Sequence, residues 1–229
     1  MSADGVWRFV LSLSVAFPAA AGIIRFKKID SSYAPFLIYI FVSLLNELVM
    51  GILIVPNSKR IVILNWNLFN LFESIILLVQ FYYWKRFKQY KRIFPIVLAI
   101  TVSAWILNDL VIVSIYEFSA VFLIAYSFVL ILLSVQTINY IIVNEERLPL
   151  TKNPKFIICA AMIIFFIYNI FVYTLMAKGV RVYDKALMGK IFAIQVYVNA
   201  FTNVLYGIAV CLMSQKTAGK EVFKDFGNE

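Results

Sequence analysis

Long apolar stretches alternate with short polar segments along the whole chain. Seven of these stretches approach or exceed the roughly 20 residues that an α-helix needs to cross a bilayer core of about 30 Å. They are continuously apolar, whereas the strands of a membrane barrel alternate apolar and polar residues. The pattern predicts an all-α membrane protein with seven transmembrane helices, at about residues 6–24, 34–55, 61–84, 94–116, 118–143, 156–177 and 191–213.

Composition supports this class of protein. The chain has 229 residues, of which 63% are hydrophobic and 14% are charged. Soluble domains average about 45–50% apolar and about 25% charged residues. We therefore expect a single seven-helix transmembrane domain over residues 1–215, followed by a tail at 216–229. We expect a multi-pass protein of the cell membrane, and specifically of a bacterial inner membrane.

The basic residues predict the orientation of the helices. The Lys and Arg residues fall mainly between or beside the spans, and one set of connecting segments carries twice as many as the other. Basic residues favour the cytoplasmic side, so the N-terminus is expected outside and the C-terminus inside. The segment from Lys178 to Lys190 is an exception, because it places four basic residues outside. The net charge of +9 therefore indicates topology rather than a nucleic-acid partner.

The first span allows a second interpretation. Arg8, an apolar stretch and then Ala19-Ala20-Ala21-Gly22 are also typical of a cleaved signal peptide. Cleavage would place the basic residues at 25–28 outside, against the charge pattern, so an uncleaved span is favoured. Pro18 lies inside this span and is expected to kink it.

Three spans share a proline near their start and an asparagine farther along. The pairs are Pro35 with Asn46, Pro95 with Asn108, and Pro154 with Asn169, and the asparagines lie 62 and 61 residues apart. The first two asparagines occur in matching pentapeptides, Leu45-Asn46-Glu47-Leu48-Val49 and Leu107-Asn108-Asp109-Leu110-Val111. Three repeated helical hairpins would explain the spacing, and so would seven helices of similar length joined by short loops.

These polar residues are expected at matching depths. At 1.5 Å per residue, the three asparagines lie about 16–23 Å beyond the inner boundary, in the outer half of the bilayer. Asparagines in spans often only join neighbouring helices by hydrogen bonds, and that interpretation stays open. Ionisable residues in spans are more often functional, which favours a site that includes Glu47 and Asp109.

Two further spans add polar positions on single faces. Asn70 and Glu73 are three residues apart in the third span and therefore share one helical face. Gln195 and Asn199 begin a polar stripe in the seventh span, which must face the interior of the bundle or water rather than lipid. We expect an outer-half cavity lined by Glu47, Glu73, Asp109, Asn46, Asn70, Asn108, Asn169, Asn199, Gln195 and Tyr173.

The chemistry of such a cavity leaves several functions open. The acids would be protonated hydrogen-bond donors, bind a cation, or exchange protons with a transported solute. We expect a transporter or channel for a cation, a proton or a small polar or basic solute. A receptor or sensor that binds a small ligand in the same cavity is the alternative. An intramembrane enzyme ranks third, since the chain has no histidine and no Ser-based triad or metal motif.

The expected partners follow from this assignment. They are the lipid bilayer and a small polar or cationic ligand, with a second copy of the chain or a cytoplasmic signalling protein as further possibilities. No nucleic acid, cofactor, metal or catalytic residue is expected. Cys159 and Cys211 both lie in apolar stretches, so buried thiols are expected rather than a disulfide framework.

Overall fold

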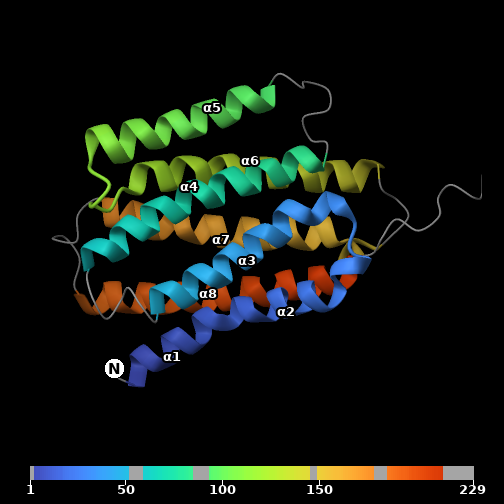
Figure 1. The fold of residues 1–229 in the computed structure, drawn as a ribbon, viewed down its shortest axis with the longest axis horizontal. Helices are drawn as coiled ribbons and strands as arrows, with labels where there is room; N and C mark the ends of the chain where they lie inside the picture. Colours follow the sequence, from blue (N-terminus) through green and yellow to red (C-terminus); the bar gives the residue numbers. More distant parts are fainter. Residues whose placement is uncertain (1–2, 52–58, 85–92, 145–148, 178–184, 214–229) are drawn as a thin grey trace, which may run out of the picture.

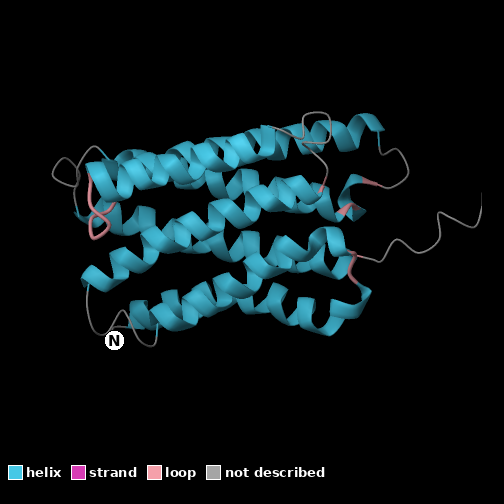
Figure 2. Ribbon diagram, turned by 45° about the horizontal axis from the view of Figure 1, so that its top comes forward, coloured by secondary structure: helices cyan, strands magenta, loops and turns pink. Residues whose placement is uncertain are grey.

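The computed structural model describes residues 3–51, 59–84, 93–144, 149–177 and 185–213. All regular elements in these ranges are helices, which confirms the all-α class for the described part of the chain (Figure 2). The α-helices are α1 (Ala3–Ser12), α2 (Ala16–Arg25), α3 (Ala34–Val49), α4 (Lys59–Tyr83), α5 (Ile93–Trp105), α6 (Ala120–Asn144), α7 (Pro154–Ala177) and α8 (Lys185–Leu212). Shorter helices are η1 (Leu13–Val15), η2 (Phe26–Lys28), η3 (Ser31–Tyr33), η6 (Ile106–Ile112) and η7 (Leu150–Lys152).

Seven helical segments within the described ranges are long and apolar enough to cross a membrane, as the sequence predicts. They are Phe9–Lys28, Ser31–Val49, Arg60–Tyr83, Ile93–Ile112, Ala120–Asn144, Pro154–Met176 and Gly189–Leu212. The fourth segment ends earlier than predicted, at Ile112. Residues 52–55 of the predicted second span lie outside the described residues. The predicted tail at 216–229 also lies outside them. Successive segments run in opposite directions (Figure 1).

Six of the seven segments form a ring, and the helix α5 lies outside it. The helices pack in the order α2, α3, α4, α6, α7, α8 and back to α2, with α1 also against α8. The helix α5 touches α4 and α6 from the outer side of this ring (Figure 1). Many of its apolar side chains are exposed, including Ile96 and Ile100, as expected for a face that meets lipid. The ring therefore decides which polar residues can meet in the centre.

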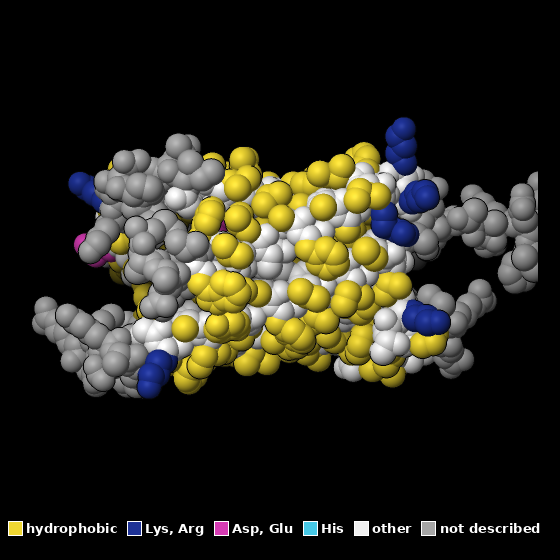
Figure 3. All heavy atoms as spheres, turned by 90° about the horizontal axis from the view of Figure 1, so that it is seen from below, with side chains coloured by type: hydrophobic (Ala, Val, Ile, Leu, Met, Phe, Trp, Pro, Cys, Tyr) yellow, Lys and Arg dark blue, Asp and Glu magenta, His cyan; other side chains and the backbone are white. Residues whose placement is uncertain are grey.

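Apolar side chains also cover the outside of the bundle. Figure 3 shows one face, where hydrophobic side chains occupy the middle and the Lys and Arg side chains lie at the two ends. Lys27, Lys28, Lys152 and Lys155 lie around the end of the bundle at which α2 and α8 finish. We refer to this as the basic end, and to the other as the N-terminal end, because α1 begins there (Figure 1).

The first span is interrupted one turn before Pro18. The 3₁₀ turn η1 separates α1 from α2, and Figure 1 shows a bend between them. Pro18 cannot donate to the carbonyl of Ser14, and its ring crowds that carbonyl, so the helix tightens there. Asn203 of α8 donates a 2.9 Å hydrogen bond to the Ser14 hydroxyl and ties the interruption to the ring. The kink predicted from Pro18 therefore corresponds to a fixed structural feature.

Close packing fills the ring toward its basic end. Leu77, Phe81, Ala209 and Met213 are almost fully buried there. Gln80 joins α4 to the start of α3, because its Oε1 accepts from the backbone N–H of Phe36 at 2.7 Å. Its Nε2 donates to the carbonyl oxygen of Ser32 at 2.8 Å. Among the described residues, buried side chains and the two hydrogen bonds of Gln80 thus pack this end of the ring.

Candidate functional site

A cavity of about 600 Å³ lies inside the ring. It extends from the middle of the bundle toward the N-terminal end, where α3 and α7 finish and where α4 and α8 begin. Side chains from α1, η1, α3, α4, α7 and α8 contribute to its wall. Its lining residues are Ser12, Val15, Tyr39, Ile40, Ser43, Asn46, Glu47, Met50, Asn65, Trp66, Phe69, Asn70, Glu73, Phe165, Asn169, Tyr173, Phe192, Gln195, Val196, Asn199, Asn203 and Tyr206.

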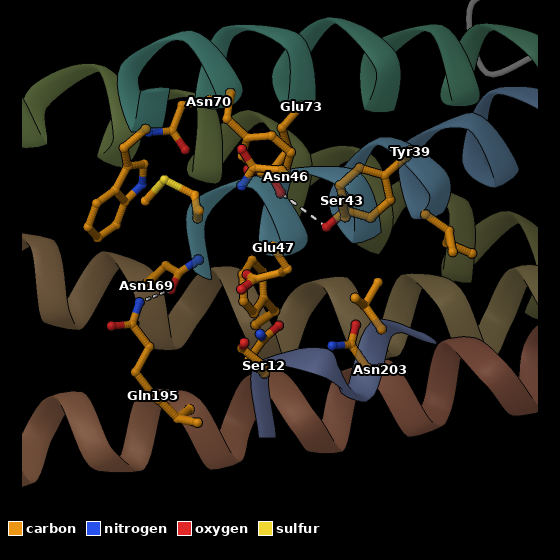
Figure 4. Close-up of a pocket in the computed structure, with 18 of the residues that line it drawn as sticks. Ser12, Tyr39, Ser43, Asn46, Glu47, Asn70, Glu73, Asn169, Gln195 and Asn203 are labelled. Carbon is orange, nitrogen blue, oxygen red and sulfur yellow. Dashed lines mark hydrogen bonds between the residues drawn. The ribbon is translucent and has the colours of Figure 1, made fainter. Parts of the chain in front are cut away.

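Eight of the ten predicted site residues line this cavity. They are Asn46, Glu47, Asn70, Glu73, Asn169, Tyr173, Gln195 and Asn199. They come from α3, α4, α7 and α8. Figure 4 labels Asn46, Glu47, Asn70, Glu73, Asn169 and Gln195, whose side chains come from these helices toward the cavity. Amides and acids from four separate helices thus share one internal space.

Asn108 and Asp109 do not join them. They lie in η6, the π-helical continuation of α5, and α5 is outside the ring. Asn108 Nδ2 donates to Asp109 Oδ2 at 3.1 Å and also to the hydroxyl of Ser119. The expectation that three acids meet in one cavity therefore fails for Asp109. Its position also argues against equivalent repeats, because Asn46 and Asn169 face the cavity while Asn108 does not.

Glu73 forms the deep end of the cavity with two tyrosines. Tyr39 of α3 donates to Glu73 Oε1 at 3.1 Å, and Tyr126 of α6 donates to Oε2 at 2.6 Å. Glu73 as a whole residue is 5% exposed. Two hydroxyl donors hold both of its oxygens in place, so its orientation is set by three different helices. Tyr39 also packs edge-to-face on Tyr206, with ring centroids 6.4 Å apart.

Three buried polar atoms of the described cavity wall have no hydrogen-bond partner. They are the hydroxyl of Ser43, the amide nitrogen of Asn70 and the hydroxyl of Tyr206. The residues Asn70 and Tyr206 are the most deeply buried of the three, at 4% and 3% exposed. Buried polar groups in proteins are nearly always hydrogen-bonded, and an unsatisfied one costs about 1–3 kcal/mol. Partners from water or a ligand inside the cavity would remove that cost.

Amides form the part of the cavity nearer the N-terminal end. Asn65 donates to Asn46 Oδ1 at 2.7 Å, which joins α4 to α3. Gln195 donates to Asn169 Oδ1 at 3.0 Å, which joins α8 to α7 (Figure 4). These side chains both join neighbouring helices and line the cavity.

Glu47 is the second acid of the cavity. It lies two turns after Tyr39 on α3, about 12 Å along the helix axis toward the N-terminal end. Figure 4 shows its side chain directed toward α7 and α8, close to Ser12. It is half-buried, in contrast to Glu73. The two acids therefore sit at two levels, and the deeper one is the better shielded.

The ionisable acids and bases of the described cavity wall are unequal in number, because Glu47 and Glu73 have no basic counterpart there. None of the lining residues, all of which belong to the described part of the chain, is Lys or Arg. Seven are aromatic and seven are amides, so the wall offers ring faces and hydrogen bonds but no fixed positive charge. Such a wall favours cations and neutral polar groups over anions.

Sequence patterns did not identify several of the important residues. Tyr39 and Trp66 lie in apolar stretches where an aromatic residue is unremarkable. Asn203 and Tyr206 belong to the polar residues of the seventh span, and Tyr206 is part of its polar stripe with Thr202, but neither is among the expected site residues. Thr202 of the same stripe instead donates to the carbonyl oxygen of Asn199 at 2.9 Å.

Comparison with protein-family models, with curated proteins and with solved structures gave no match. The case for a function therefore depends on the geometry and chemistry of the cavity.

Proposed function

We propose that the protein is a membrane transporter or channel for a cation, a proton or a small polar or basic solute, which enters through this cavity. The proposal includes an orientation with the N-terminus outside, so that the cavity faces away from the cytoplasm. Support for the orientation comes from the sequence, in which one set of connecting segments carries twice as many Lys and Arg residues as the other.

One observation carries the proposal. Glu47 and Glu73 share a cavity between helices of membrane length, and no Lys or Arg is present among its described lining residues. Acids in a span are costly and are characteristic of ion and substrate pathways. The packed basic end suits a transporter in a state that admits solute from one side, since an open channel would need a continuous path.

A receptor or sensor is the second candidate. The packed layer of Leu77, Phe81 and Met213 beneath the cavity favours it, because a ligand pocket needs no exit to the cytoplasm. Binding would then be transmitted to the basic end, where a cytoplasmic partner could associate. This function predicts ligand binding without solute movement.

Flux measurements on the full chain in liposomes separate these candidates. The interior would hold a pH-sensitive or cation-sensitive dye, and proton, Na⁺, K⁺ and organic amine gradients would be imposed in turn. We expect a flux that Glu73→Gln abolishes and that Asp109→Asn, an acid-to-amide change outside the cavity, leaves intact. Absence of flux under every gradient, or equal loss in both variants, would reject the transport proposal.

A further inference from the structure

The size of the cavity limits what it can hold. A volume of about 600 Å³ is within the range of about 300–1,000 Å³ that is typical of sites for small organic molecules. A water molecule occupies about 30 Å³ in the liquid, so a proton or a bare metal ion would leave most of this space to solvent. The space is matched to an organic solute.

The wall indicates what kind of organic solute. Two aromatic side chains of the wall meet at the Glu73 end: Tyr39 donates to Glu73 and packs edge-to-face on Tyr206, which also lines the cavity. Ring faces beside a carboxylate attract an organic ammonium group through both its charge and the aromatic quadrupole. Phe165 and Phe192 offer an apolar surface for the rest of the molecule.

The unpaired polar atoms define the hydrogen bonds that are missing. The Tyr206 oxygen can accept from an ammonium N–H, and Glu73 can accept further bonds beside those from its two tyrosines. The amide nitrogen of Asn70 lacks an acceptor, which a hydroxyl or carbonyl oxygen on the same ligand would supply. No cationic side chain in the described wall could pair with a ligand carboxylate.

We propose that the cavity binds a protonated organic amine that carries an apolar body and a neutral oxygen, with its ammonium group at Glu73 and Tyr206. Glu47 lies nearer the N-terminal end and attracts the cation during entry. This proposal specifies the solute class within the proposed transport function, but the binding step it describes is the same in a receptor.

Binding can be tested in detergent with three small molecules that share a skeleton. Phenylethanolamine carries an ammonium group, phenylethylene glycol is its neutral analogue, and mandelate is an anionic analogue. Unfolding temperature and isothermal calorimetry of the full chain would be measured with each, and with NaCl and KCl at equal ionic strength. We expect phenylethanolamine alone to stabilise the protein, because a ligand that binds the folded state raises its melting temperature.

Two variants locate the binding position. Glu73→Gln should weaken phenylethanolamine binding about tenfold or more, as expected for loss of a charged hydrogen-bond partner. Asp109→Asn is the matched control and should bind as the unmodified protein does. If Glu73→Gln fails to fold, Tyr206→Phe serves instead: it should weaken binding while leaving stability without ligand unchanged or higher, because the hydroxyl it removes has no partner.

The outcomes separate this inference from the transport proposal. Equal binding of the three molecules, binding of none, or unaltered affinity in both Glu73→Gln and Tyr206→Phe would overturn the inference, even if another solute is transported. Selective, Glu73-dependent binding would support the inference, and absence of phenylethanolamine flux in liposomes would then reject transport alone and favour a receptor.

Discussion

Tyr126 and Glu73 are joined by a 2.6 Å hydrogen bond across 53 residues of sequence. The bond connects α6 to α4 at the deep end of the cavity, where the ring of helices has one of its smaller interfaces. It therefore has both a structural and an orienting role: it holds the ring together, and it fixes the acid on which the proposed binding depends.

The Tyr126→Phe variant should lower stability. It removes one hydrogen-bond donor from a buried carboxylate and leaves the aromatic ring of residue 126 in place. The free energy of unfolding should fall by about 1.5–3 kcal/mol. Thermal unfolding in detergent, followed by circular dichroism, would measure the loss. Tyr83→Phe is the matched control, since Tyr83 is 48% exposed on the outside of α4. Equal melting temperatures for the two variants would contradict a stabilising bond between Tyr126 and Glu73.

Gly207 should be intolerant of a methyl group. A Cβ at this position would overlap the ring of Phe17, closer than any normal contact. Gly207→Ala should therefore cost about 1–3 kcal/mol as the Phe17 ring is displaced from α8. Combining it with Phe17→Ala should cost less than the sum of the two single changes, and a double-mutant cycle would detect this. Additive effects would show that the two residues are not coupled.

Gln80 is expected to keep the basic end packed. Gln80→Met preserves length but leaves the N–H of Phe36 and the carbonyl of Ser32 without this partner. Each buried unsatisfied group costs about 1–3 kcal/mol, so the melting temperature should fall and amide exchange at Phe36 should accelerate. Gln136→Met, at an exposed position of α6, is the comparison. Unchanged exchange at Phe36 would mean that Gln80 does not stabilise this end.

Thiol labelling should reveal the direction in which the cavity faces. In a background with Cys159 and Cys211 replaced, Asn199→Cys should react with a membrane-impermeant maleimide added outside intact cells. Lys27→Cys, exposed at the basic end, should react only after the membrane is permeabilised. Leu77→Cys, which replaces a fully buried residue, should resist labelling in both conditions. The opposite pattern, with Lys27→Cys labelled in intact cells and Asn199→Cys only after permeabilisation, would mean that the cavity faces the cytoplasm.

Local sequence patterns were sufficient to predict the apolar segments and most of the polar residues that were expected to line the cavity. An apolar stretch of about 20 residues has few alternatives to a membrane helix, so the seven segments follow from length and composition. Polar residues such as Asn169 and Gln195 are costly against lipid, so their inward orientation could also be expected, and they do line the cavity. Pro18 likewise predicts the interruption of the first span, which the structure has at η1.

The sequence by itself thus determined that there are seven apolar helical segments of membrane length, with polar groups embedded in them. Only the tertiary structure decided which of those groups meet. Glu47 and Asp109 occupy near-identical pentapeptides, yet α3 belongs to the ring and α5 lies outside it. The order of helices around a bundle, and the partners that Tyr39 and Tyr126 find in Glu73, depend on packing between segments distant in sequence. Periodicity within one helix describes the faces of that helix alone, and it carries no information about the neighbour that each face will contact.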